Sequence, residues 1–372
     1  MKIVSILGAR PQFIKAAPVS KAIRVKANAG NNLKEVIVHT GQHFDRNMSE
    51  IFFDEMGIPK PDYQLNIQSL NHGAMTGRML EKIEKVLLKE KPDMVIVYGD
   101  TNSTLAGAVA TVKLHIPLAH VEAGLRSFNR EMPEEHNRVL TDHCADILFC
   151  PTRTAVDNLV KEGIGSFGAS SNSEKSCGPF VHLVGDTMFD AVLMFSAMVS
   201  LHSQLLEAIG IESQEYFLAT VHRPYNTDDS THLTSIIQAF YELDKPVIFP
   251  VHPRTRAKLN QAGVAVETRA SKNIQLIDPV GYLDMLALAK NAKVIITDSG
   301  GLQKEAYFLG VPCLTLRPET EWVETVQSGW NVLVGTSKQK IVQTALNHAW
   351  PTELPQAFGD GHAAERIVAH IV

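Results

Sequence analysis

The chain has 372 residues, enough for two or three domains with a sizeable core. Its apolar content of 45%, charged content of 20% and formal net charge of −5 are ordinary for a globular protein, so we expect neither nucleic acid nor a membrane as partner. No apolar run is long enough to cross a bilayer, and no signal-peptide pattern is present. The four cysteines include no CxxC pair, which favours a reduced, cytoplasmic protein.

Strands and helices alternate through the first half of the chain. A strand at residues 2–7 is followed by a turn at Gly8 and by a helix that Pro11 opens at its first position. Further strands are predicted at 35–39, 94–97, 116–121 and 147–150, and helices at 72–90 and about 101–113. This alternation predicts a doubly wound parallel sheet with right-handed crossovers.

Charged side chains follow several of these strands. Arg10 and Lys15 stand in or near the first strand-to-helix turn, where backbone N–H groups favour an anion, although both could be solvated surface charges. The turn at Gly8 lacks the GxGxxG pattern, so no dinucleotide is expected. Asp100 follows the strand at 94–97, where it either caps the next helix or takes part in catalysis.

The stretch from His120 to Arg138 carries a dense cluster of ionisable groups. It follows an apolar run that predicts a buried strand, so its first residues lie at the carboxyl edge of the sheet, where ligands bind. Pro133 can open a helix that places two carboxylates at its positive end. A solvated loop with ion pairs is one explanation, and an acid–base site is the other, since two carboxylates in different surroundings can differ in pKa. The ionisable side chains are His120, Glu122, Arg126, Glu134 and Glu135.

A second series of strands and helices follows. Residues 165–179 are rich in Ser and Gly and predict a flexible surface loop near a domain boundary. The sequence therefore predicts two Rossmann-like domains, 1–180 and 181–357, with the active site in the cleft between them. Strands are predicted at 181–184, 217–221, 247–251, 274–277, 294–297 and 313–316, and a helix at 188–208.

Residues 297–301, Thr-Asp-Ser-Gly-Gly, precede a helix and have the outline of a phosphate cradle. Two glycines let the backbone approach an anion, and the helix N-terminus contributes about half a positive charge. A pyrophosphate also needs nearby cations, for which Arg10, His222 and Arg223 are candidates. Glu305, about one turn into the helix, could bind two ribose hydroxyls. A helix N-cap followed by glycines explains the motif about as well.

Several motifs occur together and in order in one known family. They are residues 8–15 (GARPQFIK), 99–101 (GDT), 120–126 (HVEAGLR), 133–138 (PEEHNR), 297–301 (TDSGG) and 359–361 (GDG). With these motifs the chain resembles, nearly end to end, the non-hydrolysing UDP-N-acetylglucosamine 2-epimerases. The resemblance implies a glycosyltransferase-B-like fold, no metal or other cofactor, a homodimer, and a C-terminal helix, 358–372, that packs back on the first domain.

The resemblance also implies a reaction and a set of site residues. A base removes the C2 proton of the UDP-sugar while UDP leaves C1, and UDP then adds back to a 2-acetamidoglucal with the proton delivered to the other face. This converts UDP-GlcNAc into UDP-ManNAc for cell-surface polysaccharide synthesis. The residues matching catalytic positions are Asp100, Glu122, Glu134 and His222. The expected substrate-binding residues are Arg10, Lys15, His43, Arg138, Arg223, His252, Met285, Ser299, Gly300, Gly301 and Glu305.

The chain departs from the family pattern at three places. Many members have Thr-Arg-Pro-Glu where residues 9–12 are Ala-Arg-Pro-Gln, His-Arg-Arg where 222–224 are His-Arg-Pro, and Arg-Glu where 44–45 are Phe-Asp. The last two departures put activation by a second substrate molecule in doubt. The first motif and residues 320–324 (TEWVE) look more like the branch acting on UDP-2,3-diacetamido-2,3-dideoxyglucuronate, which is the alternative substrate.

The sequence leaves three other functions open. A glycosyltransferase of the same architecture would need an acceptor and would not exchange solvent deuterium into C2 of the sugar. A hydrolysing epimerase would release free N-acetylmannosamine. A non-catalytic sugar-nucleotide sensor would have no use for the carboxylates of Glu122 and Glu134.

Overall fold

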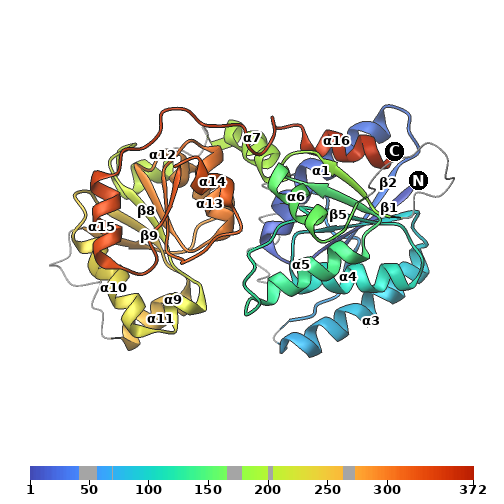
Figure 1. The fold of residues 1–372 in the computed structure, drawn as a ribbon, viewed down its shortest axis with the longest axis horizontal. Helices are drawn as coiled ribbons and strands as arrows, with labels where there is room; N and C mark the ends of the chain where they lie inside the picture. The colour runs from blue at the N-terminus through green and yellow to red at the C-terminus, as the bar shows by residue number, and fades with distance from the viewer. Residues whose placement is uncertain (42–56, 69, 166–177, 200–203, 263–272) are drawn as a thin grey trace. The chain divides into compact units, whose positions relative to one another are not determined.

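The computed structural model describes residues 1–41, 57–68, 70–165, 178–199, 204–262 and 273–372. The chain divides into two compact units (Figure 1). Unit 1 comprises Met1–Leu193 with Gln356–Val372, and unit 2 comprises Met194–Pro355. Each unit is built on its own parallel β-sheet with helices packed on it, which confirms the predicted α/β fold class.

Unit 1 contains a seven-stranded sheet in the order β3-β2-β1-β4-β5-β6-β7, and all of its paired strands are parallel. The central strand β4, Met-Val-Ile-Val-Tyr, is buried along its whole length, as expected for a parallel strand covered on both faces. The strands span Lys2–Leu7 (β1), Lys34–His39 (β2), Tyr63–Gln64 (β3), Met94–Tyr98 (β4), Leu118–Val121 (β5), Ile147–Cys150 (β6) and Phe180–Leu183 (β7).

Helices cover both faces of this sheet. On one face α3, α4 and α5 pack side by side, and on the other α1 packs with α16 (Figure 1). Met79, Ile83, Val86 and Leu87 form the buried stripe of α3, with the spacing of one helix face. The helices span Arg10–Asn28 (α1), His72–Glu90 (α3), Asn102–Lys113 (α4), Pro133–Cys144 (α5), Arg153–Lys161 (α6), Thr187–Val199 (α7) and Ala363–Ile371 (α16).

The boundary between the units differs from the predicted one. The predicted boundary at residue 180 falls inside the sheet of unit 1, because β7 pairs with β6 as its last strand. The C-terminal helix α16 belongs to unit 1. There Asp190 accepts hydrogen bonds from the N–H groups of Ala363 at 3.2 Å and Ala364 at 2.7 Å, at the positive end of the helix.

Unit 2 contains a six-stranded parallel sheet in the order β10-β9-β8-β11-β12-β13. Alternate residues of β8 enter different apolar clusters, so Phe217 and Ala219 belong to one face of the sheet and Leu218 to the other. The strands span Phe217–Thr220 (β8), Val247–Pro250 (β9), Ile274–Ile277 (β10), Val294–Thr297 (β11), Cys313–Thr315 (β12) and Asn331–Leu333 (β13). The helices span Gln204–Ile209 (α8), Pro224–Thr227 (α9), Ser230–Tyr241 (α10), Pro253–Gln261 (α11), Tyr282–Asn291 (α12), Gly300–Phe308 (α13), Val323–Gln327 (α14) and Lys338–Asn347 (α15).

Several element predictions need correction. The short strands β3 and β13 were not predicted, and the predicted helix 188–208 corresponds to α7 and α8, with residues 200–203 outside the described part of the chain. Most of the predicted loop at 165–179 also lies outside it. Within the described ranges, no helix is both long and apolar enough to span a membrane.

Candidate active site

The strand order of each sheet reverses once, and several of the predicted functional groups lie at these reversals. In unit 1 the chain moves outward from β1 in one direction and from β4 in the other, and in unit 2 the reversal lies between β8 and β11. Ligands of open parallel sheets bind outside the carboxyl ends of the strands at such a point. Arg10 and Lys15 follow β1, Asp100 follows β4, His222 follows β8 and Ser299 follows β11.

The turn between β1 and α1 satisfies two of its own amides. The side chain of Gln12 folds back, and its Oε1 accepts hydrogen bonds from the N–H groups of Gly8 at 2.8 Å and Ala9 at 3.0 Å. Its Nε2 donates to the Tyr98 carbonyl oxygen at 2.7 Å. These two backbone N–H groups, which we expected to favour an anion, already donate to Gln12. Binding of an anion by Arg10 would therefore use its guanidinium.

Glu122 directly follows β5 and has an unusual backbone conformation. Its φ of +73° lies in the left-handed region that residues other than glycine rarely adopt. Its buried carboxylate forms an ion pair with the Lys15 ammonium. The end of the neighbouring strand β4 is close to this ion pair, since a Cβ at Gly99 would lie 3.3 Å from Lys15 Nζ and 3.6 Å from Glu122 Oε1. Backbone strain of this kind persists where the surroundings enforce it, and it clusters at functional sites.

Asp100 is held by α5 and does not cap a helix. The N-cap of α4 is Thr101, whose hydroxyl accepts a hydrogen bond from the N–H of Thr104. Asp100 Oδ2 accepts instead from Arg138 Nη2 at 2.6 Å, and Arg138 Nη1 donates to Glu135 at 2.7 Å. The capping explanation for Asp100 is therefore wrong.

The two neighbouring glutamates of α5 differ in their surroundings. The helix begins at Pro133, as predicted, so both lie in its first turn at the positive end. Glu135 is buried and accepts hydrogen bonds from the N–H groups of Ser127 and Phe128, which ties the preceding loop to the helix. Glu134 is half-buried and lies four residues before Arg138, on the same helix face. The arrangement therefore places Glu134 on the side of α5 that holds Asp100.

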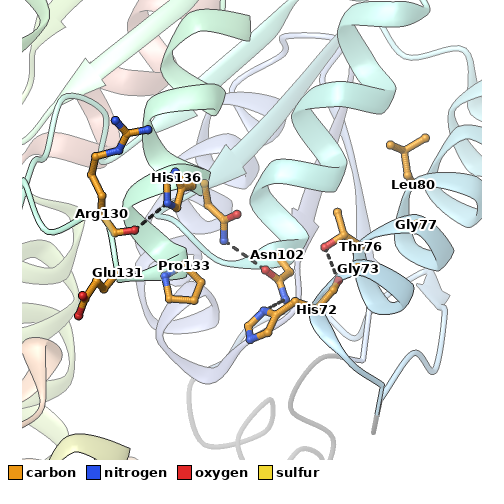
Figure 2. A pocket seen from close by; sticks show the side chains of 11 residues that line it. His72, Gly73, Thr76, Gly77, Leu80, Asn102, Arg130, Glu131, Pro133 and His136 are labelled. Carbon is orange, nitrogen blue, oxygen red and sulfur yellow. Dashed lines mark hydrogen bonds between the residues drawn. The ribbon is translucent and has the colours of Figure 1, made fainter.

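A pocket of about 650 Å³ opens in unit 1 where α3, α4 and α5 begin (Figure 2). Asn102 lies between its two sides, because its amide nitrogen is 3.1 Å from His72 Nδ1 and its Oδ1 accepts from Asn137 Nδ2 at 3.2 Å. Asn137 also donates to the carbonyl oxygen of Asp100 at 2.9 Å, so the pocket adjoins a predicted catalytic residue. The lining residues are His72, Gly73, Thr76, Gly77, Leu80, Asn102, Arg130, Glu131, Pro133, His136 and Asn137. His72 and Asn102 were not among the predicted site residues.

A network of four ionisable side chains connects β5 and the loop after it with α5 and the end of α6. Three of the four side chains are fully buried. His120 Nδ1 is 2.7 Å from Asp142 Oδ1, and Arg126 Nη1 donates to Asp142 Oδ2 at 2.7 Å. Arg126 also donates twice to Glu162, at 2.7 Å each. Burial alone raises the pKa of Asp142, but the hydrogen bonds and charges of His120 and Arg126 bring it below its usual range. His120 and Arg126 are thus held by carboxylates that the sequence did not single out.

His222 faces a buried carboxylate in unit 2. Asp298 accepts hydrogen bonds from the N–H groups of His222 at 3.0 Å and Arg223 at 2.9 Å, and from Asn226 Nδ2 at 3.0 Å. His222 Nδ1 lies 3.2 Å from Asp298 Oδ1, and the side chain is 48% exposed. A carboxylate at Nδ1 keeps the proton on that nitrogen, so Nε2 is the nitrogen left for proton exchange or anion binding.

The predicted phosphate cradle forms the start of α13. Ser299 is the N-cap, and its Oγ accepts from a backbone N–H of the first turn at 3.4 Å. Gly300 packs closely, since a Cβ there would lie 2.6 Å from Oε1 of the buried Glu321. A Cβ at Gly301 would meet nothing nearer than Ser299 Oγ at 3.9 Å. Capping and close packing thus explain Ser299 and Gly300 within the unit, and both remain compatible with a phosphate.

The other predicted binding residues are dispersed. Glu305 is buried in α13, His252 is the exposed N-cap of α11, and Met285 packs against an apolar cluster of unit 2. His43 lies outside the described residues. Within the described ranges, no three His, Cys, Asp or Glu side chains form a group that could hold a metal ion.

Two parallel-sheet α/β units with polar groups at their strand ends define a glycosyltransferase-B-like protein. A family model for UDP-N-acetylglucosamine 2-epimerase matches residues 25–372. The chain is 54% identical to a UDP-N-acetylglucosamine 2-epimerase homolog of Methanococcus maripaludis, covering 99% of this chain and 98% of that one. It is 53% identical to the UDP-2,3-diacetamido-2,3-dideoxy-D-glucuronate 2-epimerase of Pseudomonas aeruginosa, covering 100% and 99%.

A solved structure is similar over the same length. The UDP-GlcNAc 2-epimerase of Methanocaldococcus jannaschii, in complex with UDP-GlcNAc and UDP, has a TM-score of 0.87 and 45% identity, covering 100% of this chain and 99% of that one. The chain therefore belongs to the UDP-N-acetylglucosamine 2-epimerase family, and it is a nucleotide-sugar C2 epimerase.

Proposed function

We propose that the enzyme reversibly inverts C2 of a UDP-2-acetamido sugar by elimination and re-addition of UDP. A base takes the C2 proton, the C1–O bond to UDP breaks, and a C1–C2 double bond forms, giving a 2-acetamidoglucal. UDP then re-forms the bond to C1 while a proton reaches C2 from the opposite face. Both faces of C2 need a proton-transfer group, so a single carboxylate does not suffice.

Asp100, Glu122 and Glu134 are the proposed proton-transfer groups. The proposal rests on the short distance between the ends of β4 and β5. A Cβ at Gly99, the residue before Asp100, would lie 3.6 Å from Glu122 Oε1. Glu122 is paired with Lys15 and Asp100 with an arginine, so the carboxylates have different surroundings. Each positioned acid or base typically raises the reaction rate by about 10²–10⁴-fold.

Stabilisation of the departing UDP has to lower much of the barrier, because the C2 proton is only weakly acidic. We assign the diphosphate to Ser299, Gly300 and the N-terminus of α13, and the ribose to Glu305. A helix dipole contributes roughly 0.3–1 kcal/mol per charge, so further donors are needed. Arg10 and His222 are the proposed ones, with Nε2 of the histidine turned toward the ligand.

Two UDP-sugars are candidate substrates. UDP-GlcNAc is the substrate that the motif set implies, and the M. jannaschii relative has it bound. UDP-2,3-diacetamido-2,3-dideoxyglucuronate is supported by the forms of residues 9–12 and 320–324. The P. aeruginosa enzyme named for it is 53% identical, beside 54% for the M. maripaludis UDP-N-acetylglucosamine 2-epimerase homolog. We propose the diacetamido uronate as the better substrate.

Parallel kinetics on the two sugars test the substrate assignment. Product formation is followed by proton NMR at C1 and C2 with UDP still attached, and kcat/KM is compared. We expect inversion of the diacetamido uronate with the larger kcat/KM. A larger kcat/KM for UDP-GlcNAc would reverse the assignment, and release of free sugar would contradict the non-hydrolysing reaction.

We further propose that the enzyme acts as a cytoplasmic homodimer that supplies precursors for cell-surface polysaccharides. The resemblance of its motifs to the family supports this setting. Sedimentation velocity at micromolar concentration tests the dimer, and a monomer under those conditions would contradict it.

A further inference from the structure

His120 in β5 has an acceptor at each ring nitrogen. Its Nε2 lies 2.7 Å from the carbonyl oxygen of Gly99, which can only accept, so Nε2 carries a proton. Its Nδ1 lies 2.7 Å from Asp142 Oδ1, so one further proton must be shared between these two atoms. The side chains of His120 and Asp142 are fully buried.

The surroundings of Asp142 decide where this second proton resides. Its other oxygen accepts from Arg126 Nη1 at 2.7 Å and from the N–H of Gly124 at 3.1 Å. These two donors favour the ionised carboxylate. Burial raises the pKa of Asp142, but the hydrogen bonds and charges of His120 and Arg126 bring it below its usual range. The second proton therefore belongs to His120. With Arg126 and Glu162 the network then holds two positive and two negative charges, which is the balance that a buried ionic cluster requires.

We propose that His120 is a positioning residue whose imidazolium, held by Asp142, fixes the Gly99 carbonyl and thereby the two strand ends that carry Asp100 and Glu122. The inference rests on the proposed function, because it concerns the placement of the carboxylates assigned there. His120 touches neither the substrate nor the reacting atoms in this account.

The geometry links one ring to both strand ends. Gly99 immediately precedes Asp100, and its φ of +61° gives it a backbone conformation that a hydrogen bond at its carbonyl helps to hold. His120 lies two residues before Glu122, whose own φ is also positive. The Gly99 N–H donates to the Val121 carbonyl at 2.9 Å, which completes the connection between the strand ends. Loss of the ring would let both carboxylates shift, and a displacement of about 1 Å can cost roughly 10²-fold in rate.

The protonation state is tested on the unaltered enzyme. Nitrogen NMR of protein carrying ring-labelled histidine, at pH 7.5, should show one imidazolium with both nitrogens protonated, which is absent from the His120→Asn spectrum. A neutral tautomer at His120 would overturn the inference. This measurement does not depend on the activity of the enzyme. The variant serves only to assign the NMR signal to His120.

The positioning role is tested by kinetics of His120→Asn against His115→Asn. His115 is exposed in the turn before the same strand, where its φ of +55° suits asparagine. We expect kcat of His120→Asn to fall roughly 10²-fold with KM changed less than about threefold, while His115→Asn stays at the wild-type rate. UDP titration by calorimetry counts the competent sites, so kcat is expressed per folded molecule.

The outcomes separate the inference from the proposed function. An unchanged kcat per UDP-binding site in His120→Asn would overturn the positioning role and leave the epimerase proposal standing. A wild-type enzyme that inverts neither UDP-sugar would overturn the proposed function, and the positioning role with it. A misfolded variant is recognised by its lost UDP binding, and the NMR result on the wild type then decides.

Discussion

At the scale of single residues, each of two carboxylates of the unit 1 site is paired with a cation, and one of them also has a strained backbone. Glu122 combines a positive φ, burial and an ion pair with Lys15. Asp100 takes its position from Arg138, which also binds Glu135. Each carboxylate therefore has its own cation, and neither depends on the other for neutralisation.

Substitution of Glu122 by Gln should remove proton transfer while preserving the shape of the site. We expect kcat to fall by about 10²–10⁴-fold, because an amide cannot accept the C2 proton. UDP affinity, measured by calorimetry, should change little, since Glu122 is not among the groups assigned to UDP. Glu81→Gln, on the exposed face of α3, is the matched control. A wild-type rate for Glu122→Gln would refute the assignment.

Gly99→Ala tests the closeness of the strand ends. A Cβ at this position would crowd Lys15 Nζ at 3.3 Å, and alanine at a φ of +61° costs roughly 1–2 kcal/mol. Gly335→Ala has nearly the same φ, +60°, with no atom within 4 Å of the new Cβ. Both variants should lose similar unfolding free energy in urea titrations, but a drop in kcat is expected for Gly99→Ala alone. Equal activity of the two variants would show that the crowding at Glu122 is unimportant.

Sequence patterns singled out the candidate residues of the unit 1 site more readily than the side chains that pair with them. Glu122, Asp100 and Lys15 were singled out because they follow strands, and strand ends of a parallel sheet are recognisable from the sequence. Asp142 and Glu162 were missed, since their pairing with His120 and Arg126 joins elements whose contact depends on tertiary packing. The role of Gln12 was missed for a related reason, because a side chain that folds back on its own turn leaves no periodic signal.

At the scale of elements, the first turn of each helix determines which backbone N–H groups are left for a ligand. The N-terminus of α1 is closed by Gln12, whereas α13 begins with a serine cap and two glycines of different surroundings. Gly300 is confined by Glu321, and Gly301 has room. The sequence predicted both helix starts, but the same residue types could not reveal which amides were already satisfied.

The two glycines of α13 should therefore respond oppositely to alanine. Gly301→Ala should raise the unfolding free energy by about 0.5–1 kcal/mol, because alanine favours a helix and meets open space. Gly300→Ala should lower it by about 1–3 kcal/mol, since its Cβ would overlap Oε1 of Glu321, which is itself paired with Arg317. Urea denaturation of both variants measures the difference. If Gly300→Ala were as stable as Gly301→Ala, the packing described for this turn would be wrong.

At the scale of the whole molecule, the chain leaves unit 1 through α7 and returns to it with α16. The return was implied by resemblance, and Asp190 at the start of α16 anchors it. The two parallel sheets were predictable from alternating strand and helix patterns. The unit boundary was not, because β7 is short, partly exposed and followed by a helix that both units share.

Asp190 should make stability depend on pH. Burial raises the pKa of its carboxyl from 3.8 to about 6, so the folded state binds the proton more tightly than the unfolded state. This contribution is complete below about pH 3.8 and is lost as pH rises through 6. Between pH 5 and 7 the unfolding free energy of the wild type should fall by roughly 1 kcal/mol relative to Asp190→Asn.

Asp360→Asn is the control for that pH dependence. Its neighbour Arg366 lowers the pKa of the Asp360 carboxyl to about 2, so this group stays ionised between pH 5 and 7. The stability difference between wild type and Asp360→Asn should therefore be flat over the same range in urea titrations. A flat difference for Asp190→Asn as well would contradict the burial and contacts described for Asp190.

Deuterium incorporation at C2 tests the central claim most directly. The enzyme is incubated in D₂O with each UDP-sugar, and the nucleotide sugars are recovered intact for mass spectrometry and proton NMR. We predict that UDP-bound product and recovered substrate both acquire deuterium at C2, and that Glu122→Gln shows almost none. Inversion at C2 with the original hydrogen retained would contradict proton removal by these carboxylates.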